Sequence, residues 1–291
     1  MDTEKDKYSI HSTDYSVGQD NIKKWGFDVH NPVFGMSAGL ILIFLVATLI
    51  TDSATAKSVL DGLKWDIIGN FDGLFIWAGN IFVIFCLAVA LSPFGKIRLG
   101  GKTAIPEHSR VSWLAMLFAA GMGIGLMFWA VAEPVAYLTG WYETPLGVEA
   151  NTPEAARMAM AATMYHWGLH PWAIYGVVAL SLAFFSYNKG LPLSIRSIFY
   201  PILGDRAWGW AGHIVDILAV LATLFGLATS LGLGAQQAAS GIQHVFGIEA
   251  GLGLQVIVIT VVTLLAVVSV LRGIDGGVKV ISNINMLVAF L

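Results

Sequence analysis

Three glycines stand at alternate positions in a long apolar stretch. They are Gly121, Gly123 and Gly125, within AAGMGIGLMFWAVAEP at residues 119–134. Glycine inside a helix costs about 1 kcal/mol relative to alanine, so this spacing predicts an unwound or closely approached backbone at membrane depth. Such backbone must be buried in protein or line a cavity, and in transporters it marks substrate or ion sites. The alternative is helix packing through the GxxxG pair, which leaves Gly123 unexplained.

Aromatic residues gather in YHWGLHPWAIY, residues 165–175. Trp172 and Tyr175 are three apart and share a helix face, whereas Trp167 lies to one side unless Pro171 bends the chain. The faces of such rings attract quaternary ammonium groups, with roughly 0.5–2 kcal/mol per cation–π contact. An aromatic packing layer or interfacial belt is the other interpretation.

His166 and His170 lie four residues apart in the same segment, which is the spacing of metal ligands on a helix. However, Trp167 stands where a zincin carries its glutamate, and no third ligand is evident nearby. We therefore expect hydrogen-bonded structural histidines, with an intramembrane metalloenzyme as a less favoured alternative. For Glu133 and Asp216, which lie near span ends, we expect salt bridges.

Hydroxyl and small residues recur in TLFGLATSLGLGAQ, residues 223–236. They allow close helix approach, which is the favoured interpretation from this pattern alone. Hydroxyl oxygens of Thr223, Thr229 and Ser230 are also suitable ligands for a hard cation such as sodium.

The composition indicates the elements that position these residues. The 291 residues are 56% hydrophobic and 12% charged, against about 25% charged in soluble domains. We predict an all-α polytopic membrane protein. Apolar runs predict spans at roughly 32–51, 70–91, 112–138, 155–187, 211–245 and 252–271, with a seventh starting near 278.

Basic residues predict the orientation of these spans. Lysines and arginines cluster in the tail, in the second and fourth connections, and around the sixth span, whereas the alternate connections carry Lys57 and Lys64. This bias places the amino terminus in the cytoplasm. Residues 1–29 are expected to be a flexible cytoplasmic tail. Because the chain stops inside a hydrophobic run, we expect it to be a fragment of a longer protein.

The segments AGMGIGLMFWAVAEP, HWGLHPWAIY and ATLFGLATSLGLGAQQ, in this order, resemble the betaine/choline/carnitine transporter (BCCT) family. The resemblance runs from about Val33 to Leu291. It implies a glycine betaine transporter-like chain with a LeuT-type inverted-repeat core, truncated after about six and a half of twelve spans. Residues 30–110 would be two accessory helices, and residues 111–291 an incomplete first repeat.

The resemblance also implies roles for individual residues. Trp167, Trp172 and Tyr175 match the family's ammonium-binding aromatic box, beside the glycine segment. Ala119 and Met122 match positions whose carbonyls bind sodium, and Thr223 matches one threonine of a second sodium site. Leu227 replaces the other threonine of that site, which leaves the stoichiometry open. Gly125 stands where choline carriers often have a carboxylate, so a zwitterionic substrate is implied.

We therefore expect no enzyme but a sodium-coupled importer of a quaternary ammonium solute, glycine betaine above all, in the bacterial cytoplasmic (inner) membrane. The alternative within transport is a proton-coupled choline importer, and a membrane sensor without flux belongs to another class. Sodium is the expected coupling ion, with no further cofactor and no nucleic-acid partner. The family resemblance implies a homotrimer in the lipid bilayer.

Overall fold

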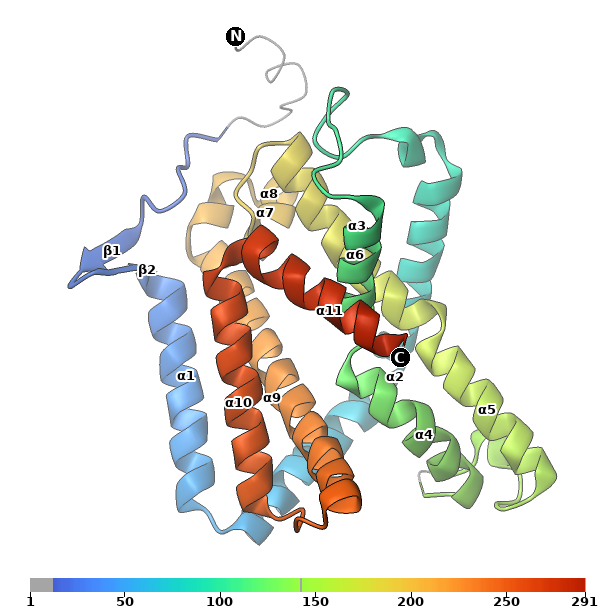
Figure 1. The fold of residues 1–291 in the computed structure, drawn as a ribbon. Coiled ribbons are helices and arrows are strands. Elements are labelled where there is room, and N and C mark those ends of the chain that lie inside the picture. Colours follow the sequence, from blue (N-terminus) through green and yellow to red (C-terminus); the bar gives the residue numbers. More distant parts are fainter. Residues whose placement is uncertain (1–12, 142, 291) are drawn as a thin grey trace. The chain divides into compact units, whose positions relative to one another are not determined.

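The computed structural model describes residues 13–141 and 143–290. Its regular elements are helices and one two-stranded hairpin (Figure 1). The strands and α-helices are β1 (Asn21–Lys24), β2 (Phe27–His30), α1 (Asn31–Ile50), α2 (Ser53–Leu91), α3 (Arg110–Gly121), α4 (Ile124–Thr139), α5 (Pro153–Trp167), α6 (Leu169–Ala183), α7 (Ile195–Ile198), α8 (Tyr200–Leu203), α9 (Trp210–Phe246), α10 (Leu252–Leu271) and α11 (Lys279–Ala289). Short helical turns of other types are η1 (Pro93–Lys96), η2 (Pro145–Gly147), η3 (Phe184–Asn188), η4 (Gly204–Trp208) and η5 (Ile274–Val278).

The described chain divides into two compact units. The first takes the chain up to Ala104 together with Gly168–Leu224, and the second takes Ile105–Trp167 together with the chain from Phe225 onward. The first unit therefore holds α1, α2, α6 and the start of α9. The second holds α3, α4, α5, α10, α11 and the remainder of α9.

Within the described residues, five helical stretches are long and apolar enough to cross a bilayer, and the bent pair α3–α4 makes a sixth if it counts as one span. The five are α1, α2, the stretch Pro153–Asn188, α9 and α10. The prediction of an all-α polytopic membrane protein is confirmed. The last predicted apolar run forms α11, which is 11 residues long and follows the π-helical turn η5.

Helix α2 begins at Ser53, well before the predicted start near residue 70. The Asp52 carboxylate accepts a hydrogen bond from the Thr55 amide at 2.9 Å and caps this end. Four charged side chains between residues 57 and 66 lower the hydropathy there. They do not break a helix, so the apolar run marks only its second half.

In the first unit, small residues let α2 and α6 pack closely. Gly79 is buried in α2, and a Cβ atom built there would lie 3.5 Å from the His170 ring. A Cβ built on Gly176 of α6 would lie 3.8 Å from Cys86 Sγ. Close approach at small residues is typical of membrane helices. It fixes α6, which carries two of the predicted aromatic site residues.

In the second unit, α4 packs against α5 through alanines. Ala136 in α4 and Ala155 and Ala159 in α5 are fully buried. Helix α3 packs against α11, where Asn283 Nδ2 donates to Ser112 Oγ at 3.4 Å. These contacts hold the two halves of the broken span against their neighbours.

Residues within the expected tail form the hairpin. β1 pairs antiparallel with β2, from Asn21 opposite His30 to Lys24 opposite Phe27. The segment expected to be a tail therefore contains regular backbone pairing, and His30 at the end of β2 contacts His213 of α9. Residues 1–12 lie outside the described part of the chain.

Candidate functional site

The glycine segment interrupts the third span as predicted. α3 ends at Gly121 and α4 begins at Ile124. Between them, Met122 (φ −87°, ψ 69°) and Gly123 (φ −87°, ψ 171°) are not helical, and the two helices meet at a bend of 51°. A Cβ at Gly123 would meet nothing within 4 Å, so neither space nor backbone angles demand glycine in this conformation. The predicted break is confirmed.

The break exposes backbone carbonyl groups at the end of α3. The Met122 amide donates to Phe118 O at 2.7 Å, and beyond the break the Met127 amide donates to Gly123 O at 3.2 Å. Carbonyls in the last turn of a helix generally lack an amide partner within the helix, and Ala119 lies in that turn. Carbonyl oxygens are the ligands that hard cations prefer. The backbone at the predicted sodium positions is therefore chemically suited to an ion.

Gly125 and Trp167 meet within the second unit. A Cβ built on Gly125, in the first turn of α4, would lie 4.0 Å from Cη2 of the Trp167 ring, an ordinary van der Waals contact. Trp167 is the last residue of α5. Thus one residue of the glycine segment lies against one residue of the predicted aromatic set.

A buried carboxylate holds the other end of the same indole. Glu133 of α4 accepts a hydrogen bond from Trp167 Nε1 at 2.7 Å on Oε2, and one from His166 Nδ1 at 2.8 Å on Oε1. The Glu133 side chain is only 7% exposed, whereas His166 is 61% exposed. Glu133 thus has His166 as a hydrogen-bond partner, and this contact is a salt bridge when the His166 ring is protonated.

The predicted common face of His166 and His170 is wrong. α5 ends at Trp167, Gly168 has φ −78° and ψ −122°, and α6 starts at Leu169. His166 binds Glu133, whereas His170 Nε2 lies 3.0 Å from Asn80 Oδ1 of α2. Within the described residues no cluster of three or more His, Cys, Asp or Glu side chains is arranged for a metal ion. The two histidines have the structural hydrogen bonds expected of them.

Trp172 and Tyr175 lie three apart on α6, in the first unit. Both side chains are exposed. Pro171 does not bend the chain between Trp167 and Trp172, because it lies in the first turn of α6 and the break falls at Gly168. Trp167 itself belongs to the second unit.

Thr223 lies on α9, and its hydroxyl donates to Ala219 O one turn back at 2.8 Å. Thr229 does the same to Phe225 O at 3.0 Å. Each hydroxyl oxygen keeps its acceptor lone pairs, because its proton is used within the helix. Leu227, between them, has an exposed apolar side chain.

A second polar cluster, in the first unit, surrounds Arg196 of α7. Its Nε lies 3.2 Å from Asp216 Oδ2, an ion-pair distance without hydrogen-bond alignment, and its backbone amide donates to Asp216 Oδ1 at 3.0 Å. Arg196 Nη2 donates to the Tyr15 hydroxyl at 2.8 Å, and Nη1 to His213 Nδ1 at 3.3 Å. The salt bridge expected for Asp216 is confirmed. Burial, followed by the nearby Arg196 charge, lowers the pKa of His30, which also contacts His213.

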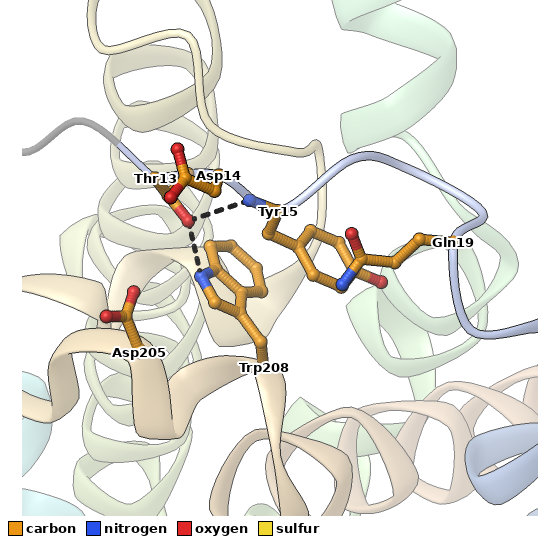
Figure 2. Close-up of a pocket in the computed structure, with 6 residues that line it drawn as sticks. All are labelled: Thr13, Asp14, Tyr15, Gln19, Asp205 and Trp208. Carbon is orange, nitrogen blue, oxygen red and sulfur yellow. Dashed lines mark hydrogen bonds between the residues drawn. The ribbon is translucent and has the colours of Figure 1, made fainter.

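The amino-terminal segment is bound to this cluster through Tyr15. The Tyr15 and Trp208 rings stack with centroids 4.4 Å apart and planes 9° apart, and the Arg196 guanidinium lies within 5.4 Å of both centroids. Figure 2 shows Thr13 beside this stack, with its Oγ1 accepting hydrogen bonds from Trp208 Nε1 and the Tyr15 amide.

Two cavities of about 430 Å³ each lie within single units. The first adjoins the Tyr15–Trp208 stack (Figure 2) and is lined by Thr13, Asp14, Tyr15, Gln19, Asp205 and Trp208. The second lies in the second unit between α4 and α9, and is lined by Met127, Phe128, Val131, Ala132, Gln236, Gln237 and Ser240. The second therefore adjoins the helix that follows the glycine break.

The sequence did not predict the hydrogen bond between Glu133 and Trp167 or the extent of the Arg196 cluster. For Glu133, the available signal was a glutamate near the end of an apolar span. In the Arg196 cluster, Tyr15 and Arg196 lie 181 residues apart in the sequence, and no local pattern connects them.

Comparison with known proteins gives consistent results. A family model described as "BCCT, betaine/carnitine/choline family transporter" matches residues 32–291. "Glycine betaine transporter 1" of Vibrio parahaemolyticus is 84% identical over 286 residues, covering 98% of this chain and 55% of that protein. The same organism's "Glycine betaine/proline/choline/ectoine transporter VP1456" is 64% identical, covering 100% of this chain and 52% of that protein.

A more distant relative is the "High-affinity choline transport protein" of Escherichia coli K12, which is 41% identical over 90% of this chain and 38% of that protein. The chain thus spans about half the length of the two Vibrio relatives, and less of the third. These relatives are transporters by name, and none is named as an enzyme.

Proposed function

Because this chain belongs to the betaine/carnitine/choline transporter family, we propose that it is part of an importer of quaternary ammonium solutes, with glycine betaine as the substrate. The observation that carries the proposal is the helix break at Met122–Gly123, two residues before Gly125, whose position faces the Trp167 ring. A non-helical backbone segment and the edge of the Trp167 ring therefore lie close together where α4 packs against α5. Bare backbone carbonyls can bind an ion, and the face of an aromatic ring can bind an organic cation.

The substrate site proposed here uses Trp167, Trp172 and Tyr175 for the ammonium group and Gly121, Gly123 and Gly125 for backbone flexibility and access. The name of the 84% identical Vibrio relative supports glycine betaine as the substrate. Gly125 supports a zwitterion, because a glycine adds no charge beside Trp167, whereas a carboxylate there would favour a net cation.

Sodium is the proposed coupling ion. Carbonyls of Ala119 and Met122 lie at the break, and Thr223 offers a hydroxyl oxygen on α9. Coupling requires sodium and substrate to favour the same outward-facing state, since each ligand shifts that equilibrium only by its differential affinity. Leu227 in place of a threonine supports one sodium ion rather than two.

The architecture proposed for the complete protein is a LeuT-type inverted repeat with alternating access. In it, residues 1–29 form a cytoplasmic segment, residues 30–110 two accessory helices, and residues 111–291 the incomplete first repeat. The basic residues flanking the spans support a cytoplasmic amino terminus in the bacterial inner membrane. Assembly as a homotrimer is proposed from the family.

Uptake of labelled glycine betaine should depend on sodium and resist choline. The measurement uses the full-length protein in cells that lack their own carriers, in sodium and then in potassium buffer, with unlabelled choline as competitor. Equal uptake in both buffers, or strong inhibition by choline, would favour the second candidate, a proton-coupled choline importer. The 41% identical relative named as a choline transport protein supports that candidate.

Replacing Trp172 by leucine should weaken the apparent affinity for glycine betaine about 5- to 30-fold, which corresponds to roughly 1–2 kcal/mol for a desolvated cation–π contact. The concentration dependence of initial uptake gives this value, normalised to the amount of protein in the membrane. Trp77→Leu on α2 is the control, because it removes an exposed indole outside the proposed site and should leave the affinity unchanged. An unchanged affinity in Trp172→Leu would remove Trp172 from the site.

A further inference from the structure

Glu133 is an unusual residue for its position. Its carboxylate is buried in a membrane-spanning helix pair, and its two oxygens accept hydrogen bonds from Trp167 and His166 at 2.7 and 2.8 Å. A charged group in such a place is costly and is retained where it is paired or functional. The hydrogen bond with His166 accounts for one oxygen only, so the bond to Trp167 needs its own explanation.

The chemistry of the two donors explains why a carboxylate is present. The Trp167 indole N–H can only donate, and the His166 ring donates from Nδ1 when it contacts a carboxylate oxygen. An ionised carboxylate is an acceptor at both oxygens, so it satisfies both rings at once. An amide at this position would offer one acceptor and one NH₂ group.

The indole of Trp167 is thereby anchored to α4 at its pyrrole N–H, which donates to Glu133. Its six-membered ring points toward Gly125 of α4, where an added Cβ would lie 4.0 Å from Cη2. Trp167 is also the last residue of α5, directly before the break at Gly168. Because Trp167 ends its helix, contacts outside that helix must fix the orientation of its ring. The hydrogen bond to Glu133 is such a contact.

A fixed ring plane matters for cation binding. An ammonium group is attracted to the face of an indole and not to its edge. A hydrogen bond from the indole N–H to a negative carboxylate also adds electron density to the ring, which strengthens the attraction for a cation. Both effects act through Trp167.

We propose that Glu133 is a positioning residue for the ammonium site: it fixes the Trp167 indole plane along α4 and makes that ring a stronger partner for a cationic headgroup. This inference rests on the proposed function, because it requires Trp167 to bind substrate. It predicts that Glu133 acts on substrate affinity and does so by way of Trp167.

The test measures initial uptake of glycine betaine by the full-length protein, with the amount of transporter in the membrane quantified. Glu133→Gln should raise KM about three- to tenfold and change the maximal rate per transporter less than about twofold. Trp167→Phe, which keeps a ring but removes the N–H, should raise KM similarly. In the Trp167→Phe background, Glu133→Gln should change KM little further, because the N–H through which Glu133 acts on the ring is already absent.

Ser112→Ala is the matched control, since it removes a buried polar group of the same unit that contacts no aromatic site residue. It should leave KM unchanged. The inference is overturned if Glu133→Gln lowers only the maximal rate, or if it adds its full effect in the Trp167→Phe background. If no Glu133 variant reaches the membrane, an unchanged KM in Trp167→Phe overturns it equally.

Failure of the proposed function gives a different result. If Trp167→Leu and Trp172→Leu both leave KM unchanged, the aromatic side chains do not bind substrate, whatever Glu133 does. If both raise KM while Glu133→Gln does not, the aromatic site stands and only the role of Glu133 is wrong.

Discussion

Replacing Arg196 by methionine should destabilise the folded protein by about 3–5 kcal/mol, the cost of leaving one partner of a buried ion pair without the other. The side chains of Arg196 and Asp216 are 6% and 15% exposed, so water cannot compensate the carboxylate left behind. The variant also removes the cation from the Tyr15–Trp208 stack. Thermal unfolding of the purified full-length protein in detergent, followed by loss of the monodisperse chromatographic peak, measures the effect.

The double variant Arg196→Met/Asp216→Leu is the control. Replacing both members of a buried ion pair by apolar residues is often close to neutral, so most of the stability should return. A double variant as unstable as Arg196→Met would show that the guanidinium acts through Tyr15 and Trp208 instead. A single variant as stable as the parent would contradict the buried pair altogether.

Replacing Gly125 by aspartate should change substrate preference. Position 125 lies against the Trp167 ring, with ordinary van der Waals space for a Cβ. A carboxylate there would attract a net cation and repel the carboxylate of glycine betaine. We expect the ratio of choline to glycine betaine uptake to rise about 30- to 100-fold, or roughly 2–3 kcal/mol of differential interaction.

Gly125→Asn is the matched control for that exchange, because asparagine has nearly the same shape and no charge. It should leave the ratio of the two solutes close to that of the parent protein. An equal change in the aspartate and asparagine variants would mean that the added volume, and not the charge, alters selectivity. Competition uptake with both labelled solutes provides the measurement.

Local chemistry made the glycine break predictable, whereas the second helix break required the fold. Alternate glycines weaken a helix wherever they stand, and the chain is non-helical at Met122 and Gly123. At residues 165–175 the sequence left a bend at Pro171 as one possibility, because proline is the stronger helix breaker by propensity. A proline in the first turn of a helix loses no hydrogen bond, so Pro171 fits the start of α6 and the break falls at Gly168.

Long-range pairs lay beyond prediction for a related reason. Hydropathy identified the apolar helices but says nothing about which polar side chain meets which. Charged partners were expected for Glu133 and Asp216 as a class, but the hydrogen bond of Glu133 with His166 and the ion pair of Asp216 with Arg196 emerged only with the fold. The contact of Gly125 with Trp167 likewise depends on how α4 and α5 pack.

The attachment of Tyr15 and Thr13 to the Arg196 cluster has a consequence for synthesis of the chain. Their hydrogen-bond partners, Arg196 and Trp208, follow 181 and 195 residues later in the sequence. At about 5–20 residues per second, a ribosome needs roughly 10–40 s to reach them. The segment with Thr13 and Tyr15 therefore stays without these two partners while four predicted spans are translated. Its docking is a late event, because it requires that α7 and η4, which carry these partners, have already been made.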